Sequence, residues 1–449
     1  MKEKQKNAVR CFDFMVSFWG QRYREYFVNL CLASLLAPNN LPLLRAADGH
    51  RLLIATTIDD WQAIIGLPIF AKLREYVTPV FVEVAAGPGS ATPGSADVIR
   101  HQNVCQKALV ETAYANRSYG CLLWPDIIVS DGMIKALLRR AEEGCHLVLC
   151  CTLRQTEEGV LADLAGAGYG VGGVALLTKC QSLALSPRLT AALAVRHLHP
   201  DMTIYEADHG HQPFFAPFWY WRVQDHKGII LHSFFAIPVL LDYSAIDKHD
   251  TACLADDAFE SVYLGRNFYA CGGLHIVQDS DEFAILSLTP AAVMQGAAVP
   301  AARGRSTWFR DFIQRCSIRG SLVFFARRNR DALKRDLFRT PVRWHATEVD
   351  DVWRREEEDV SRLLDNAVGD YYAANSRDLR FPPLVSLNPR YLLRDLIILC
   401  HMTPMIAVPV YYTAVIIKAM AGYSEQQKLI RNRLLKIWRA AQTTFRVSP

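Results

Sequence analysis

The order of apolar segments in the first 150 residues constrains the fold more than any other feature. Apolar runs with strand character span 12–19, 51–55, 77–84, 121–129 and 146–152. Between them, apolar residues recur at helical spacing. Strands that alternate with helices form right-handed crossovers and a mostly parallel sheet that is covered on both faces. We therefore expect an α/β fold, with helices on both faces of a mostly parallel sheet.

The net charge is concentrated in one part of the chain. The 449 residues include 50 Lys and Arg and 45 Asp and Glu, which gives a net charge of +5. Residues 418–449 hold seven of the basic residues and one acid, a net of +6, so the other 417 residues carry −1. A neutral main body argues against a nucleic-acid groove running over the protein. We expect no nucleic-acid partner.

Cysteine usage indicates a reducing compartment. The 12 cysteines include no C-x-x-C pair, and Cys150 and Cys151 are neighbours, which disulfide geometry disfavours. The N-terminal segment is basic, but its apolar run is short and is interrupted by Asp13, which indicates a leading strand and not a signal peptide. We expect a cytoplasmic protein.

The sequence has no G-x-S-x-G, P-loop or kinase motif, so it gives no support to those enzyme classes.

The C-terminal third differs in character from the rest. Residues 301–385 are rich in charge and helix formers, and predict a helical extension packed on a domain formed by residues 1–300. Leu396–Ile417 then runs 22 positions without a charged residue, about the length of a bilayer span, although two prolines interrupt it. The basic stretch that follows predicts an amphipathic helix suited to an anionic lipid surface. Residues 386–449 therefore predict either a tail at or in the inner membrane, or a buried helical hairpin followed by a surface helix.

Polar and aromatic side chains stand where predicted strands end. Trp19 ends the first predicted strand, Thr56 and Thr57 follow the second, Asp126 lies late in the fourth and Asp131 follows it. Because parallel sheets bind ligands outside the carboxyl ends of their strands, we expect the chemistry at these positions. Asp126 is the better acidic candidate, since Asp131 stands at a turn and helix start, where an acid can simply cap the helix.

Five segments resemble a group of bacterial GT-A type glycosyltransferases, which are nucleotide-sugar-dependent enzymes with a Rossmann-like fold. They are FWGQRYREYFVNLCLASLLAPNN, LLIATTIDDW, LLWPDIIVSDG, HSFFAIPVLL and VQDSDEFAILSLTP, and the likeness covers about residues 11–375. The resemblance implies a GT-A-like domain that transfers a sugar from a nucleotide-sugar donor to a glycan, lipid or protein acceptor, as in the synthesis of cell-envelope polysaccharide.

The resemblance also implies roles for individual residues. Trp124-Pro125-Asp126 stands where the family has Asp-x-Asp, so Asp126 is the acid left for a divalent cation such as Mn²⁺ or Mg²⁺, with His232 as a further metal ligand. One carboxylate is a poor anchor for a hard cation, which weighs against metal dependence and leaves the diphosphate charge to Arg or Lys. Trp19 would stack on the base. The nucleotide pocket would be lined by Trp19, Thr56, Thr57 and Asp131.

A transfer that inverts the anomeric configuration needs a general base for the acceptor hydroxyl. The acidic pairs in LADDAF and QDSDEF supply the candidates. They are Asp256, Asp257 and Asp281, with Asp279 and Glu282 beside the last. Taken singly, each of these residues is better explained as a solvated loop residue or a helix cap, and a retaining enzyme needs no such base.

Four histidines support a rival class of function. They form two H-x-H pairs, His197 with His199 and His209 with His211. On a strand, residues two apart share a face, and imidazoles with nearby carboxylates suit Zn, Fe or Mn. A metal-dependent hydrolase or oxygenase is therefore one alternative, and polar loops are the other explanation of the pairs.

Trp124, in place of an acid, keeps a third function open: a non-catalytic binding protein on a degenerate GT-A fold.

Overall fold

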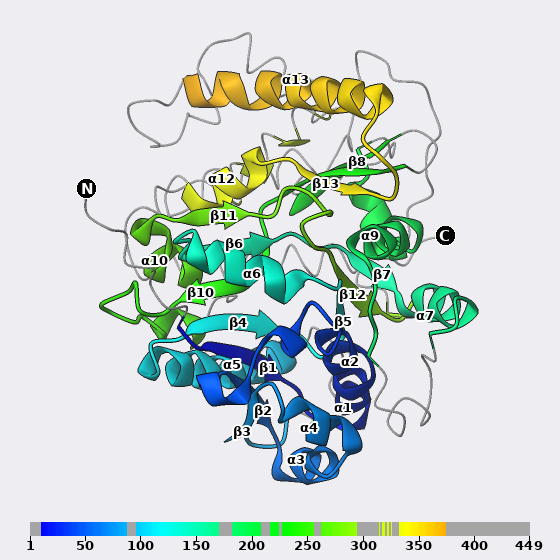
Figure 1. Ribbon diagram of the computed structural model, residues 1–449. Helices are drawn as coiled ribbons and strands as arrows, with labels where there is room; N and C mark the ends of the chain where they lie inside the picture. Colours follow the sequence, from blue (N-terminus) through cyan, green and yellow to red (C-terminus); the bar gives the residue numbers. More distant parts are fainter. Residues whose placement is uncertain are drawn as a thin grey trace, which may run out of the picture. The chain divides into compact units, whose positions relative to one another are not determined.

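The computed structural model describes most of the first 373 residues (Figure 1). The described ranges are 10–87, 96–169, 182–207, 216–223, 227–255, 262–293 and 332–373, with positions 314, 317, 318, 321, 322 and 325. The chain divides into two compact units, Met1–Val368 and Gly369–Pro449. The predicted domain boundaries at 300 and 385 stay predictions, and Leu396–Ile417 with the basic tail lies outside the described residues.

Among the helices of the described ranges, none combines the length and the apolar character that crossing a membrane requires.

A seven-stranded sheet forms the centre of the first unit (Figure 1). In spatial order its strands are β11 (Leu274–Ile276), β6 (Leu147–Cys150), β10 (Ile237–Asp242), β4 (Tyr119–Leu123), β1 (Phe12–Ser17), β2 (Arg51–Thr56) and β3 (Thr78–Glu83). Neighbouring strands are parallel except at β10, which runs antiparallel to both β4 and β6. The predicted α/β class with a mostly parallel sheet is confirmed, and a strand is present at each of the five predicted positions.

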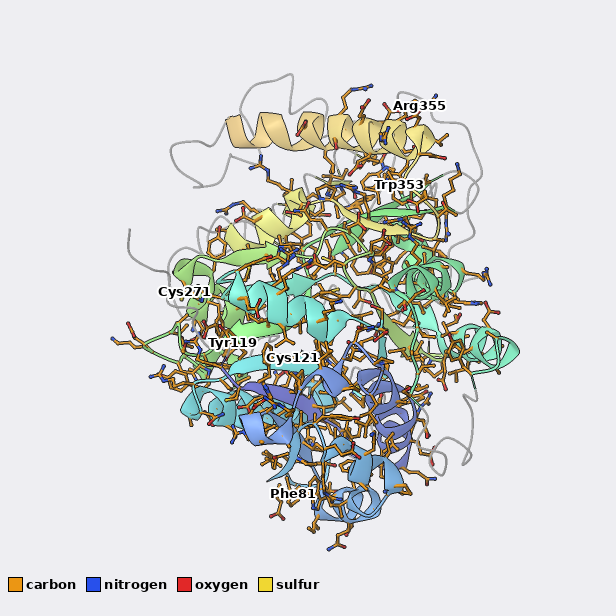
Figure 2. All side chains as sticks on the ribbon, in the orientation of Figure 1. Phe81, Tyr119, Cys121, Cys271, Trp353 and Arg355 are labelled. Carbon is orange, nitrogen blue, oxygen red and sulfur yellow. The ribbon has the colours of Figure 1, made fainter. Side chains whose placement is uncertain are left out.

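Alternate residues of the central strands enter two separate cores. Met15 and Leu53 pack in one core with α5 (Ala96–Ala115). Phe14 is next to Met15 in β1, and Ile54 is next to Leu53 in β2. These two residues pack in the other core with α4 (Pro68–Leu73) and α6 (Met133–Glu142). Successive side chains of a strand point to opposite faces, so both faces of the sheet are covered, as predicted. Figure 2 labels three positions in this sheet, Tyr119 and Cys121 on the central strand β4 and Phe81 on the edge strand β3.

The predicted strand 121–129 is divided into two strands. β4 ends at Leu123, and β5 (Ile127–Val129) belongs to a separate three-stranded sheet with β12 (Ile285–Thr289) and β7 (Arg154–Thr156). Pro125 lies at the break, and proline has no N–H to continue the ladder of a central strand. The chain therefore leaves the central sheet at Trp124 and turns toward β12.

The described structure also contains a third sheet, with one helix before and one helix after its last strand in the chain. The sheet has the order β13 (Val342–His345), β9 (Gly228–Ser233) and β8 (Phe218–Val223). Helices α12 (Ala332–Arg339) and α13 (Asp351–Ala373) lie in the region predicted to be helical, and α13 runs past the division between the two units.

The helical segment that follows β1 contains a widened turn. It consists of α1 (Gln21–Tyr26), a π-helical segment (Phe27–Cys31) and α2 (Leu32–Leu35). π-Helical turns inside α-helices occur frequently at functional sites. This helix begins just after β1, so its first residues lie at the carboxyl edge of the sheet.

Candidate functional site

The central sheet has a topological switch point between β1 and β4. β2 and β3 follow on one side of β1, whereas β4 pairs with its other side. In open α/β sheets, ligands bind outside the carboxyl ends of the strands at such a point. The segments that leave these ends are Phe18–Gly20 after β1 and Trp124–Asp126 after β4.

Asp126 is the acid at this switch point. Its side chain is half-buried, and in the described part of the chain no other side chain forms a hydrogen bond or ion pair with its carboxylate. Loss of hydration raises the pKa of Asp126 to about 6, against smaller opposing effects of its own amide and of Arg154 and Arg22. A carboxyl group with this pKa can accept or donate a proton near neutral pH.

Arg154 supplies a positive charge near this carboxylate. It is the first residue of β7 and is half-buried. β12 lies between β5 and β7, and Ser287 of β12 is paired with both Ile127 and Arg154. Within the described ranges the guanidinium forms no ion pair with an acid. Its charge partly opposes the rise in the pKa of Asp126 that burial causes. A guanidinium that is not paired with an acid of the protein can donate hydrogen bonds to a carboxylate or phosphate ligand.

A second cation near Asp126 is held in a network. Arg22 of α1 donates to the Tyr26 hydroxyl at 2.6 Å and pairs with Glu157 at 3.0 Å. The Tyr26 hydroxyl in turn donates to Glu157. Burial, followed by the hydrogen bond to Glu157, raises the pKa of Tyr26. The network joins α1 to the start of α7 (Glu157–Gly166) and orients Arg22.

Trp19 and Thr56 are placed at the carboxyl edge, as predicted. The Trp19 indole packs edge-on against His101 of α5, with ring centroids 4.5 Å apart. A side chain at Gly87 would collide with the indole nitrogen, so the backbone after β3 covers that edge of the ring. Thr56 is fully buried, and its hydroxyl has no hydrogen-bond partner in the described structure. Stacking of Trp19 on a base stays a prediction.

Thr57 has a structural task in this arrangement. It is the N-cap of α3 (Ile58–Ile65), and its hydroxyl donates to the Asp60 carboxylate at 2.9 Å. Asp60 also accepts from the amide of Gly20 and from the Arg24 guanidinium, both at 2.8 Å. This buried carboxylate therefore fixes the turn between β1 and α1. A role of Thr57 in ligand binding stays a prediction.

Asp131 and His232 make contacts within the protein. The Asp131 carboxylate accepts hydrogen bonds from the Asn39 amide at 2.7 Å and from the Asn39 side chain at 2.8 Å. It does not cap α6, because Gly132 occupies the N-cap with a φ of 101°. His232 is buried in β9 and donates through Nδ1 to the Phe338 carbonyl at 2.8 Å. Burial lowers the pKa of His232 to about 4.

The described structure does not bring His232 and Asp126 into one metal-binding group. The group of ligand-type side chains found among the described residues consists of Asp279, Asp281 and His345. His232 belongs to the third sheet, and its ring faces Trp221 and Phe338. A cation held by Asp126 stays a prediction.

The predicted catalytic acids fall in two places. Asp256 and Asp257 lie outside the described residues. Asp281 follows β11, and its carboxylate accepts two hydrogen bonds from Arg188, at 3.0 and 2.9 Å. It is one of the three side chains of the Asp279, Asp281 and His345 group.

The histidine pairs are described only in part. His197 Nε2 lies 2.8 Å from Asp163, whereas His199 is fully buried and its Nε2 lies 3.1 Å from the Pro290 carbonyl. The two rings thus have separate partners, and they are not in a common metal-binding group of the described residues. His209 and His211 lie outside those residues, so the metal-hydrolase alternative rests on them.

Sequence reasoning did not single out the basic and aromatic members of the site. Arg22, Tyr26, Arg154 and Glu157 each lie within nine residues after a predicted strand, which is the same signal that drew attention to Asp126. The approach of Arg154 and Glu157 to Asp126 depends on β12, which lies more than 100 residues later in the chain and joins β5 to β7. That pairing has no signature in the sequence.

Comparison with known proteins gives little further information. No protein-family model matches the sequence, and no curated protein matches it. Among solved structures, one match is a Bacillus anthracis protein assigned as a glucose-1-phosphate thymidylyltransferase, in complex with sucrose, at 9% identity and a TM-score of 0.21. The match covers 34% of this chain and 58% of that one. At this TM-score the likeness supports no conclusion about fold or activity.

Proposed function

We propose that the chain is a glycosyltransferase that uses a nucleotide-sugar donor at the switch point between β1 and β4. One observation carries the proposal: a half-buried carboxylate without a side-chain partner in the described structure, Asp126, lies near the cations Arg22 and Arg154. The sequence resemblance to GT-A type enzymes supports the same conclusion. The acceptor remains a glycan, lipid or protein hydroxyl.

In this proposal the two guanidiniums bind the diphosphate of the donor. Arg–phosphate hydrogen bonds are charge-assisted and bidentate, which suits two negative phosphate groups. They would take the place of the cation that an Asp-x-Asp motif holds, since Trp124 replaces the first acid. A nearby pair of positive charges also disfavours a dication at Asp126, because like charges repel.

Asp126 would accept the proton of the acceptor hydroxyl. As that oxygen bonds to the anomeric carbon, its proton passes to the carboxylate, and the bond from the anomeric carbon to the diphosphate oxygen breaks with its electron pair. A base works best when its pKa lies near the operating pH, and the pKa of Asp126 is raised to about 6. Asp256, Asp257 and Asp281 stay alternative candidates for this step.

Donor binding is the direct test. Isothermal titration of the full chain against UDP-, GDP- and CMP-linked sugars, with and without Mn²⁺, should reveal one donor that binds. Arg154→Gln should weaken that binding about 10-fold or more, as loss of a charge-assisted hydrogen bond does. Arg196→Gln, which removes an exposed ion pair with Asp163, is the matched control and should bind normally.

Two results would overturn the proposal. One is the absence of binding to every donor in the panel. The other is equal binding by the wild type and by Arg154→Gln. Donor binding without turnover, unaffected by Asp126→Asn, would instead favour the non-catalytic binding protein.

A further inference from the structure

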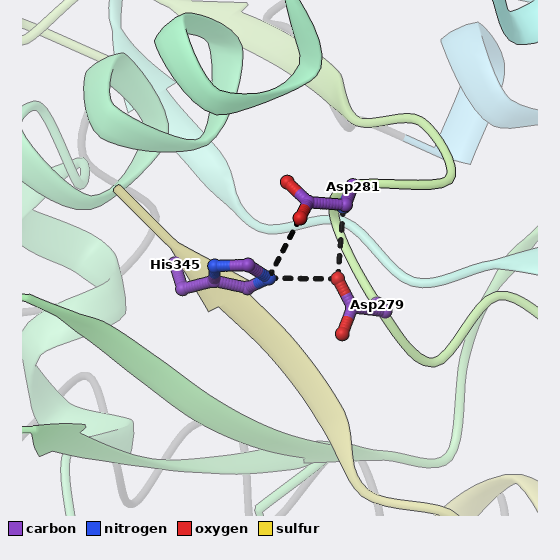
Figure 3. A group of neighbouring side chains, drawn as sticks. All are labelled: Asp279, Asp281 and His345. Atoms are coloured by element: carbon purple, nitrogen blue, oxygen red, sulfur yellow. Dashed lines mark hydrogen bonds and ion pairs between the residues drawn. The ribbon is translucent and has the colours of Figure 1, made fainter. Parts of the chain in front are cut away.

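Three ligand-type side chains converge where the loop after β11 meets β13 (Figure 3). One ligand atom from each of Asp279, Asp281 and His345 lies within 4.8 Å of the other two. His345 Nε2 is 2.7 Å from Asp279 Oδ1 and 3.9 Å from Asp281 Oδ2. The imidazole is 2% exposed, whereas Asp281 is on the solvent side.

The hydrogen bond of His345 Nδ1 determines whether Nε2 can act as a metal ligand in the neutral ring. Nδ1 lies 2.8 Å from the carbonyl oxygen of Thr347, which can only accept, so Nδ1 carries the hydrogen. In the neutral ring, Nε2 then presents a lone pair to the oxygens of Asp279 and Asp281. Three lone-pair donors this close repel each other unless a cation, either a proton on Nε2 or a metal ion, lies between them. Metal-bound histidines commonly donate their other N–H to a backbone carbonyl in this way.

Surrounding contacts hold the three ligands in position. Arg188 of α9 (Pro187–Arg196) binds Asp281 through two hydrogen bonds. The main chain of His345 donates to Ser280 Oγ at 3.2 Å, which ties β13 to the loop between the two acids. Ligating carboxylates and imidazoles of metal sites are usually supported by such partners.

The net charge around the group of Asp279, Asp281 and His345 is negative, which favours the binding of a dication. Four carboxylates and two guanidiniums are linked in ion pairs here, which leaves a net charge of −2 when His345 is neutral. The carboxylates are Asp279, Asp281, Glu348 and Glu357, and the guanidiniums are Arg188 and Arg343.

We propose that Asp279, Asp281 and the Nε2 atom of His345 bind a divalent transition-metal ion of the Zn²⁺ or Mn²⁺ type. One imidazole with two carboxylates suits these ions better than Mg²⁺ or Ca²⁺, which prefer oxygen ligands alone. Three protein ligands leave at least one coordination position for water or a ligand on the exposed side of Asp281. This site does not include Asp126 and goes beyond the proposed glycosyl transfer.

The test uses the full chain, stripped with a chelator and titrated calorimetrically with Zn²⁺, Mn²⁺, Co²⁺ or Mg²⁺. We expect one transition-metal ion per chain, a rise of several degrees in the unfolding midpoint, and visible absorption bands with Co²⁺. Asp281→Asn and His345→Gln should each weaken binding about 10-fold or more. His197→Gln is the matched control, because His197 pairs with one carboxylate, Asp163, and should bind normally.

Two outcomes would overturn the site. One is the absence of transition-metal binding by the wild type, which would mean that a proton on Nε2 is the cation of this group. The other is binding that neither variant weakens. Asp281→Asn changes an exposed side chain, so it keeps the test decisive if His345→Gln fails to fold. Asp126→Asn should leave metal binding unchanged, so failure of the metal site and failure of the proposed function are distinguishable.

Discussion

The main-chain oxygen of Asp126 accepts a hydrogen bond from the amide of Leu288 at 2.9 Å. This bond ties the segment after β4 to β12, a strand more than 150 residues later in the chain. β12 is also the partner of β7, which begins with Arg154. One strand thus holds the acid and a cation of the candidate site at the switch point.

Asp126→Asn should stabilise the fold above about pH 6. The folded-state pKa of this group, about 6, is above its ordinary value of 3.8, so folding disfavours the charged form. The group's favourable contribution is complete below about pH 4 and is lost as the pH rises through about 6. The variant should therefore equal the wild type at low pH and exceed it at pH 8 by about 1–3 kcal/mol, measured by urea unfolding.

Asp131→Ala is the control for this effect. Its carboxylate accepts two hydrogen bonds from Asn39, so its removal should cost about 1–3 kcal/mol of unfolding free energy. A loss of stability in Asp126→Asn at pH 8 would contradict the environment described for Asp126.

The rate of the proposed transfer should depend on pH through Asp126. The carboxylate must be ionised to accept a proton, so turnover should rise as the pH increases through about 6 and level off above about pH 7. The measurement is kcat across this range with the donor identified by titration. In Asp126→Asn, turnover should fall about 100-fold or more, with donor binding retained. A wild-type profile that is flat from pH 5 to 7 would assign the base to another residue.

Asp60→Ala should weaken the fold and loosen the turn after β1. It removes the acceptor of the Gly20 amide and the partner of Arg24, and leaves both near the protein interior. We expect a loss of about 2–4 kcal/mol in the free energy of unfolding. Asp59→Ala, at the exposed neighbouring position, should change it by less than about 0.5 kcal/mol. Equal effects of the two variants would argue against the Asp60 network.

His232 should make the protein acid-sensitive. Its folded-state pKa, about 4, is below the ordinary value of 6.5, because burial opposes the charged ring. Its contribution to stability is present above about pH 6.5 and is lost as the pH falls through about 4. The wild type should lose about 2–3 kcal/mol from this group over that range, and His232→Gln should lose less. Parallel stability curves for the two proteins between pH 7 and 4 would refute this.

The fold class was predictable because it depends on local patterns. Apolar runs and helical spacing placed the strands that became β1, β2, β3, β4 and β6 without any tertiary information. The antiparallel direction of β10 was not predictable, since a buried strand reads the same in either direction. The break at Pro125 had a local signal, proline in a strand, but the departure of β5 to another sheet depended on a distant partner.

The sequence by itself determined the α/β architecture, the neutral body with a basic tail, and Asp126 as an acid at a strand end. Only the tertiary structure decided the neighbours of that acid, because Arg22, Arg154 and Asp126 come from separate segments that strand pairing brings together. It also placed Asp281, a residue of the loop after β11, beside His345, some 60 residues further along the chain. Local periodicity encodes which residues are buried, whereas contacts between distant side chains arise only when the sheets assemble.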